Sequence, residues 1–416
     1  MRLAITFQRV DPSKGGAETY VADLCGRLIA RGHEVTLFAS EWDQSALPRE
    51  LICRPIAARG ATRSRRTWNF ANDSHRALLV ELIARAPFDC VLGFINTYSQ
   101  DVLVPQGGVH EASLVANAMR FPAGWRRALY MASKRLNPKS WGVYRRIERA
   151  QYDPARSTRF VAVSHMVARD LQQYRGVAPD RIRVIPNAID ADRLRVADPA
   201  ASRRAIREKH GLAETDLAAL FVAHNFRLKG LPPLLEALAK RSRNDPSVRP
   251  IHLFVCGGGK LPPMRTLVDR LGLAETVHLV GFAPSVKDYF HAADFFVLPS
   301  YYDPCSLVVF EALACGLPVI TTAKNGAGEL ITEGREGFVV PSPDDHEAMI
   351  AALEHMTRDA ARREMSRHAI ELGRAQSFDR HVDQLLDLCE GVDSWTKAVN
   401  QKHRGVAVGS GREVRA

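Results

Sequence analysis

Residues 295–318 read FFVLPSYYDPCSLVVFEALACGLP, and this stretch decides the fold. The short apolar run from Phe295 to Pro299 is typical of a buried strand. A helix is predicted to begin near Ser306, a favourable N-cap residue, and to run from Leu307 to Cys315. A strand followed by a loop and a helix is the repeating unit of an open parallel sheet.

The same alternation extends outward in both directions. On the C-terminal side of the chain's middle, strands are predicted at 217–223, 251–256, 277–280 and 318–322, with helices at 231–242, 264–271 and 286–292. Near the N-terminus, a helix is predicted at 17–31 and strands at 3–7, 34–39, 89–94, 159–164 and 182–185. The chain is therefore expected to form two doubly wound α/β domains, each built on a parallel sheet.

The expected boundaries place residues 1–190 in an N-terminal domain and 191–375 in a C-terminal domain. The two domains face a cleft, and a helix near 376–392 packs back on the first. The polar, basic stretch 192–210 is interpreted as a linker, and 396–416 as a disordered tail. Because ligands of open sheets bind beyond the carboxyl ends of the strands, the loops that follow the strands are where chemistry is expected.

Composition narrows the class of protein. A chain of 416 residues exceeds the usual size of one hydrophobic core, and its net charge of +11 favours an anionic partner. The seven cysteines show no zinc-site spacing, which fits a reducing cytoplasm. No apolar run approaches the ~20 residues of a membrane span, so we expect a cytoplasmic protein, peripheral on the inner face of the cell membrane.

Two loops could bind phosphate. Gly15 and Gly16 open a helix, where small residues and free N–H groups favour an anion, although a plain tight turn explains them equally well. Arg227 and Lys229 follow the first strand of the second half and could hold a diphosphate, or lie solvated on the surface. The loop at 257–260 departs from the P-loop pattern, because Leu261 follows its lysine.

The helix predicted from Leu307 carries the remaining candidates. Its first amides are expected to hold phosphate, and Leu307 and Glu311 share one face because they are four residues apart. Glu311 lies in an apolar run, where an unpaired carboxylate is costly. It is therefore expected to bind sugar hydroxyls; the alternative is an ordinary ion pair.

These segments carry a family resemblance. The pair Asp303 and Glu311, the loop at 15–18 and the segment 227–230 resemble retaining GT-B glycosyltransferases of family 4, as do VAVS at 161–164 and VIPNAID at 184–190. The resemblance spans roughly residues 1–390 and is strongest to the members that add glucose to the heptose of a lipopolysaccharide core.

The resemblance implies that residues 1–190 form the acceptor-side domain and 191–375 the nucleotide-sugar donor domain, and it implies a role for each matched residue. Asp303 contacts the transferred sugar, Glu311 the ribose, and Lys229 with Arg227 neutralises the leaving diphosphate. Two departures stand out: the family usually has Glu where Asp303 stands, and its arginine often adjoins its lysine or lies further upstream. The other implied contacts are the donor phosphate and acceptor at Gly15 and Gly16, the phosphates at the amides of Cys305, Ser306 and Leu307, and the reacting sugar at His110, which could equally be structural.

The implied reaction needs no metal and no cofactor. Its substrates are a nucleotide sugar, expected to be UDP-glucose, and a glycan or lipid-linked acceptor such as a lipopolysaccharide core. A nucleotide-sugar epimerase on the same fold stays an alternative, and a phosphorylase would need a longer chain. A nucleic-acid binder is disfavoured, because no recognition helix or aromatic–basic RNA motif is present.

Residues 120–149 form a basic and aromatic segment that is expected to dock on an anionic membrane surface. Its cations outnumber its one acid, Glu148. The alternative is a solvated insertion whose aromatics pack inward. The side chains concerned are Arg120, Arg126, Arg127, Lys134, Arg135, Lys139, Arg145, Arg146 and Arg149, with Phe121, Trp125, Tyr130, Trp141 and Tyr144.

Overall fold

A computed structural model describes residues 1–121, 123–137, 141–397 and 399–400. The N-terminal half is built on a parallel sheet whose strands pair in the order β5 (Ile52–Pro55), β3 (Glu34–Ala39), β1 (Arg2–Thr6), β6 (Cys90–Gly93), β7 (Val102–Leu103), β8 (Arg159–Ala162) and β9 (Ile182–Val184). A small separate sheet pairs β2 (Arg9–Val10) with β4 (Glu41–Trp42).

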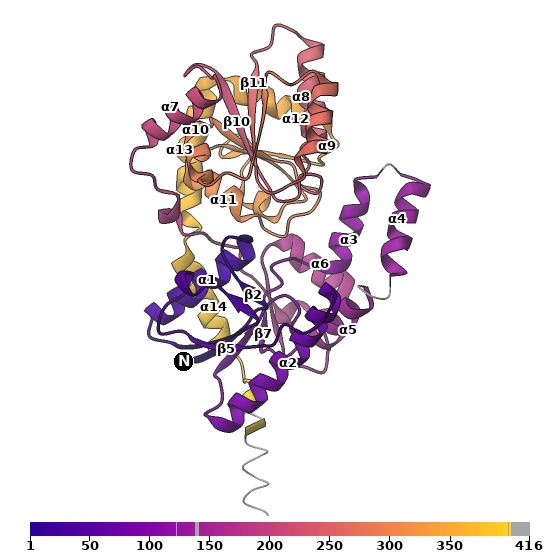
Figure 1. Cartoon of the computed structure of the whole chain (residues 1–416), viewed down its shortest axis with the longest axis vertical. Helices are drawn as coiled ribbons and strands as arrows, with labels where there is room; N and C mark the ends of the chain where they lie inside the picture. The colour runs from indigo at the N-terminus through magenta and orange to yellow at the C-terminus, as the bar shows by residue number, and fades with distance from the viewer. Residues whose placement is uncertain (122, 138–140, 398, 401–416) are drawn as a thin grey trace, which may run out of the picture.

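The N-terminal half also contains helices (Figure 1). They are α1 (Gly16–Ala30), α2 (Arg63–Ala84), α3 (His110–Met119), α4 (Trp125–Arg135), α5 (Trp141–Gln151) and α6 (His165–Arg175), with the short helices η1 (Gln44–Ala46) and η2 (Pro179–Arg181). Figure 1 shows α3 and α4 standing out from the side of the N-terminal half.

The C-terminal half repeats the design. Its parallel strands pair in the order β12 (Val277–Gly281), β11 (Ile251–Cys256), β10 (Leu217–Val222), β13 (Phe295–Leu298), β14 (Val319–Thr322) and β15 (Gly337–Val340). The helices of this half are α7 (Pro199–Lys209), α8 (Leu231–Asn244), α9 (Leu261–Leu271), α10 (Val286–Ala292), α11 (Leu307–Ala314), α12 (His346–Thr357) and α13 (Asp359–Ala375), with η3 (Ala191–Leu194) and η4 (Gly326–Leu330). The prediction of two parallel-sheet domains is confirmed.

The stretch interpreted as a linker is largely a helix. Residues 199–209 form α7, which begins at the N-cap Asp198 and packs on α10. Arg207 is 1 % exposed, donates to the carbonyl of Ala292 at 3.0 Å and lies 3.6 Å from a carboxylate oxygen of Asp294. The linker interpretation of this segment was wrong, because the charges that made it look solvated are partly buried against the C-terminal half.

Two chain crossings join the halves. The first follows β9 and the second follows α13, and they touch at a bridge between Ile189 and Ser377. Beyond the second crossing, α14 (Phe378–Glu390) lies on α1 in the N-terminal half (Figure 1). The hydroxyl of Tyr20 is 2.6 Å from Nε2 of His381, and Arg31 forms an ion pair with Asp383 at 2.6 Å.

The ordered chain continues past the predicted start of the tail. Thr396 is fully buried and donates to the carbonyl of Phe88 at 2.8 Å, and Ser394 donates to Asp101 at 2.7 Å. The boundary at 396 therefore falls inside packed structure, while residues 401–416 lie outside the described residues.

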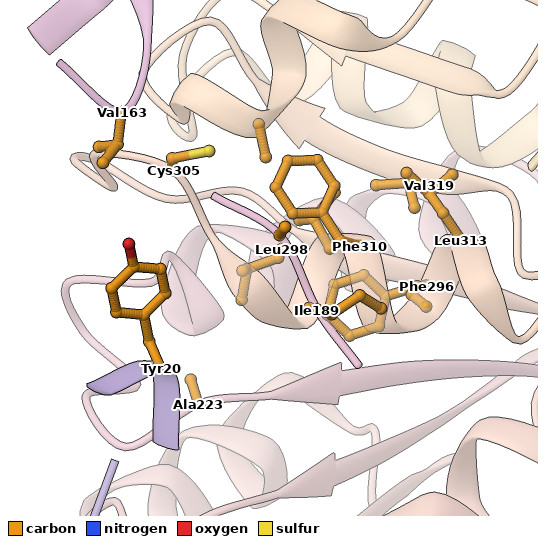
Figure 2. Close-up of a cluster of buried hydrophobic side chains, with 14 of the residues drawn as sticks. Tyr20, Val163, Ile189, Ala223, Phe296, Leu298, Cys305, Phe310, Leu313 and Val319 are labelled. Atoms are coloured by element: carbon orange, nitrogen blue, oxygen red, sulfur yellow. The ribbon is translucent and has the colours of Figure 1, made fainter. Parts of the chain in front are cut away.

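One hydrophobic cluster runs through both halves. It contains Val163 and Tyr20 from the N-terminal half together with Cys305 and Phe310 from the C-terminal half (Figure 2). In the described part of the chain, no helix combines the length and the apolar character needed to cross a bilayer.

Candidate active site

The acidic loop, defined as residues 302–305, follows β13 and carries Asp303, which forms an ion pair with Lys229. Nζ of Lys229 lies 2.5 Å from Oδ2 of Asp303. The two side chains are 22 % and 10 % exposed, so the ion pair is largely shielded from solvent. The structure therefore brings together two of the predicted catalytic residues, which are 74 positions apart in the sequence.

The position of Lys229 is fixed by the turn that ends at Gly230. Gly230 has a φ of 79°, and a Cβ there would overlap the carbonyl oxygen of Pro299 at the end of β13. The amide of Tyr301 also donates to the carbonyl of Leu228 at 2.9 Å. The segment that carries Lys229 is thus held directly against the base of the acidic loop.

Helix α11 begins at Leu307, as predicted, with Ser306 as its N-cap. The hydroxyl of Ser306 makes no capping hydrogen bond, and its amide donates to Oδ1 of Asn325 at 3.3 Å. The amides of the following first turn have no intrahelical acceptor, so they can receive an anion. Burial raises the pKa of the Cys305 thiol, so only the backbone of Cys305 suits the predicted phosphate contact.

Glu311 lies one turn further along α11. Burial raises the pKa of its carboxyl to about 7, and no hydrogen bond or ion pair from a described residue reaches it. Among the described residues, Glu311 therefore has no ion-pair partner of the kind that the alternative interpretation requires. A partly buried carboxyl without a protein partner is free to accept hydrogen bonds from a ligand's hydroxyls.

The paired glycines lie opposite this helix. A Cβ at Gly16 would come within 3.0 Å of the side chain of Leu307, so the start of α1 approaches the start of α11 closely. Two helix N-termini from different halves thus meet here, and their free amides and dipoles favour an anion between them. Gly15, in extended backbone, is the N-cap of α1.

His110 lines a cavity of about 300 Å³ in the N-terminal half, which we name the acceptor-side cavity. Burial lowers the pKa of His110, and its ring lies 4.9 Å from that of Tyr144. Gly108, on the same wall, has a φ of 71°, and a Cβ there would overlap Tyr302. The cavity therefore adjoins the acidic loop, and its polar lining includes Arg63, Asn96, His110, Ser113, Tyr144, Glu148 and Gln151.

Sequence reasoning did not find most of this cavity. Asn96 has a φ of 67°, a left-handed conformation that is unusual outside glycine, and Glu148 binds Arg175 at 2.6 Å. Glu148, the one acid of residues 120–149, therefore has its partner on α6 and not among the cations of its own segment. Besides His110, the signal in the sequence that could have marked this cavity is the asparagine that follows a predicted strand.

The structure does not bring every predicted residue to one place. Arg227 lines a different cavity, of about 520 Å³, together with Arg120 and Glu236. Its partner in the predicted clamp, Lys229, is engaged with Asp303 instead. Among the residues that the structure describes, no group of three or more His, Cys, Asp or Glu side chains is arranged to hold a metal ion.

Comparison with known proteins identifies the family. The model described as Glycosyltransferase Family 4 matches residues 14–193, and the model described as Glycosyl transferases group 1 matches residues 202–376. A probable transglycosylase of Burkholderia thailandensis is 30% identical over 90% of this chain and 93% of its own length. The chain belongs to glycosyltransferase family 4.

Two other relatives extend the comparison. The lipopolysaccharide glucosyltransferase WaaG of Escherichia coli (strain K12) is 26% identical over 91% of this chain and 96% of its own length. A D-inositol 3-phosphate glycosyltransferase of Geodermatophilus obscurus is 34% identical, but the match spans only 52% of that protein.

Solved structures give the fold. The crystal structure of WaaG, described as a glycosyltransferase involved in lipopolysaccharide biosynthesis, matches with a TM-score of 0.76 at 24% identity, covering 94% of this chain and all of that one. The structure of Anabaena HepE in complex with UDP-glucose matches with a TM-score of 0.63 at 15% identity, covering 93% and 99%. The GT-B fold and the glycosyltransferase class predicted for this chain are confirmed.

Proposed function

We propose that this glycosyltransferase moves a hexose, glucose from UDP-glucose, onto a glycan or lipid-linked acceptor such as a lipopolysaccharide core, with retention of configuration and without a metal ion. The bond between the anomeric carbon and the diphosphate oxygen breaks, and a bond to the acceptor oxygen forms on the same face of the sugar. The acceptor proton passes to the departing phosphate oxygen, so no protein base is required.

One observation carries the donor part of this proposal. The Lys229–Asp303 ion pair is largely shielded from solvent, and Asp303 follows Tyr302, which contacts Gly108 of the acceptor-side cavity, and precedes the start of α11 in the chain. A cation in such a site stabilises the charge that develops on a leaving diphosphate, which is the work a metal performs elsewhere. The carboxylate beside it is placed to bind the hydroxyls of the transferred sugar.

The choice of donor and acceptor rests on the relatives. WaaG, similar over nearly its whole length, is named as a lipopolysaccharide glucosyltransferase, and HepE was solved with UDP-glucose. The carboxyl of Glu311, which has no hydrogen-bond or ion-pair partner among the described residues, suits the ribose of such a donor. Because both matching family models are described as glycosyltransferases, transfer to an acceptor is favoured over the epimerase alternative.

A panel of nucleotide sugars tests the donor assignment. We expect UDP-glucose to be hydrolysed slowly without acceptor and consumed much faster with a heptose-containing core glycan, equally in the presence and absence of excess EDTA. Preference for another nucleotide sugar would change the donor. Activity lost with EDTA and restored by Mg²⁺ or Mn²⁺ would contradict the metal-free proposal, and epimerised UDP-sugar without transfer would favour the epimerase.

The same proposal includes docking of residues 120–149 on an anionic membrane. Helix α4 has no buried side chain, and Trp125 and Leu129 are 71 % and 61 % exposed. Exposed cations flank them at Arg126 and Lys134. An exposed helix with apolar and basic side chains is suited to a lipid interface, where each nearby cation contributes ~1 kcal/mol.

Part of the segment faces the protein instead. Tyr144 packs against His110, and Arg135 forms an ion pair with Glu111 at 2.6 Å. Lys139, with residues 138–140, lies outside the described residues, as does the side chain of Trp141. We therefore assign the docking surface to the exposed side chains of α4.

Sedimentation with vesicles tests the docking surface. We expect binding to rise with anionic lipid, to fall with salt and to weaken in an Arg126→Ser/Lys134→Ser variant. An Arg204→Ser/Arg363→Ser variant removes the same charge from exposed positions of the C-terminal half and serves as the control. Equal loss in both variants, or equal binding to neutral vesicles, would contradict docking through α4.

A further inference from the structure

We propose that Glu329 is a positioning residue for the transfer reaction. It belongs to the C-terminal half, yet it caps helix α6 of the N-terminal half, and through that helix it holds the acidic loop against the acceptor-side cavity. The inference rests on the proposed function, because it assigns Glu329 a part in glycosyl transfer at Asp303.

The first step is the cap itself. Oε2 of Glu329 accepts from the amide of His165 and Oε1 from the amide of Met166, both at 2.7 Å. These amides open α6 and have no acceptor within the helix. A carboxylate at a helix N-terminus is stabilised both by charge-assisted hydrogen bonds and by the helix dipole. One side chain of the C-terminal half therefore completes a helix that belongs to the other half.

The second step links α6 to the acidic loop. Ser164, the N-cap of α6, accepts from the amide of Val167 at 3.2 Å and donates its hydroxyl hydrogen to the carbonyl of Pro304 at 2.7 Å. The hydroxyl of Tyr302 donates to Asp170 of the same helix at 2.9 Å. Pro304 and Tyr302 are the chain neighbours of Asp303, so α6 holds the loop on both sides of that residue.

The third step closes the arrangement. The amide of Gly326, at the start of the short helix η4 that carries Glu329, donates to the carbonyl of Asp303 at 2.8 Å. A Cβ at Gly326 would overlap the carbonyl oxygen of Pro304 and approach Ser164 to 2.5 Å. The loop and η4 therefore meet backbone to backbone, and the side chain of Ser164 at the start of α6 packs against them, with no room for a side chain at position 326.

This arrangement predicts a specific kinetic signature. Without Glu329, α6 loses two of its N-terminal acceptors, and the loop it holds can shift relative to the acceptor-side cavity. The donor contacts on Lys229 and α11 do not pass through Glu329. Because a displacement of about 1 Å can cost a reaction ~100-fold, we expect turnover to fall while donor affinity is kept.

The experiment compares Glu329→Ala and Glu329→Gln with Glu333→Ala, an exposed glutamate four residues away that serves as the control. We expect kcat to fall ~10–100-fold in Glu329→Ala, with the Kd for UDP within about threefold of the unaltered protein. The kcat of Glu329→Gln, which keeps one acceptor oxygen and the shape of the side chain, is expected to lie between those of Glu329→Ala and the unaltered protein. Hydrogen exchange at the amides of residues 165–167 is expected to accelerate in both Glu329 variants and not in Glu333→Ala.

An unchanged kcat in Glu329→Ala would overturn the proposal. So would equal losses of kcat and UDP affinity in both Glu329 variants, because that pattern marks a general loss of structure. If the unaltered protein transfers no sugar at all, the proposed function fails instead. In that case the hydrogen-exchange measurement still tests the cap by itself. Exchange at the amides of residues 165–167 that is no faster in the Glu329 variants would contradict the capping role of Glu329.

Discussion

The two sides of the cleft are built differently. On the donor side, Lys229, Asp303 and Glu311 come from short contiguous segments of one half, and the key ion pair is shielded from solvent. On the acceptor side, the cavity wall combines residues from α2, α3, α5 and two strand-end loops, and the neighbouring helix α4 has no buried side chain. The proposed donor site is therefore assembled from two short segments of the sequence, whereas the proposed acceptor site combines residues from several separate segments.

The largest effect is expected on the donor side. Lys229→Ala removes the cation that is proposed to stabilise the leaving group, and Glu311→Gln alters the predicted ribose contact. A preorganised charge contact in a shielded site contributes ~3 kcal/mol to lowering the barrier, so transfer is expected to drop ~100-fold in each variant. Steady-state transfer assays, with circular dichroism to check the fold, measure this. Near-native turnover in both variants would remove these residues from the donor site.

A smaller effect is expected on the acceptor side. Arg63 is exposed at the mouth of the acceptor-side cavity, so Arg63→Ser is expected to raise the acceptor KM ~10-fold, the cost of about one charge-assisted hydrogen bond. Hydrolysis of the donor without acceptor is expected to stay unchanged. Arg65→Ser, on the same helix but not among the residues lining the cavity, is the matched control. A change in donor hydrolysis in Arg63→Ser, or an acceptor KM equal to that of Arg65→Ser, would contradict the proposed separation of donor and acceptor sites.

The smallest effect is on stability and its pH dependence. Because burial raises the pKa of Glu311 to about 7, the folded protein holds this proton more tightly than the unfolded chain does. The stability that the protonated carboxyl provides is therefore fully present below pH ~4.5 and is lost as the pH rises through about 7.

Glu311→Gln removes this dependence. Allowing for solvent screening, we expect the variant to gain about 1–2 kcal/mol in unfolding free energy at pH 8 relative to pH 5, compared with the unaltered protein. Denaturant unfolding at the two pH values measures this. If the difference in unfolding free energy between Glu311→Gln and the unaltered protein does not change with pH, Glu311 titrates as an ordinary surface carboxyl.

Five of the strands of the C-terminal half, β10 to β14, lie where the sequence predicted them, and the reason is physical. Buried parallel strands such as Phe295–Leu298 are continuous apolar runs bounded by loops, so their positions follow from local composition. The same reasoning misread 199–209, because the buried Arg207 of α7 looks solvated until its partners are known. The local sequence pattern therefore predicts which apolar segments are buried, but it does not predict which charged side chains are buried beside a partner.

The site shows the same limit. Lys229 could be singled out from its charge beside a predicted helix and Ser306 as an N-cap residue, whereas Asp303 was predicted from the family resemblance. Arg227 stands two residues from Lys229, yet it lines another cavity, and its role in the diphosphate clamp stays a prediction. Glu329 could not be found, because the amides it caps are more than 160 positions away and carry no side-chain signature.

The most direct test of the account is a calorimetric titration with UDP. The unaltered protein is compared with Lys229→Met and with the charge-balanced Lys229→Met/Asp303→Asn variant, which leaves no unpaired carboxylate. Because the diphosphate of the donor is proposed to lie beside Lys229, we expect both variants to bind UDP at least about tenfold more weakly than the unaltered protein. This corresponds to ~1.4 kcal/mol of binding free energy. Equal affinity for UDP in all three proteins would contradict the assignment of the donor site.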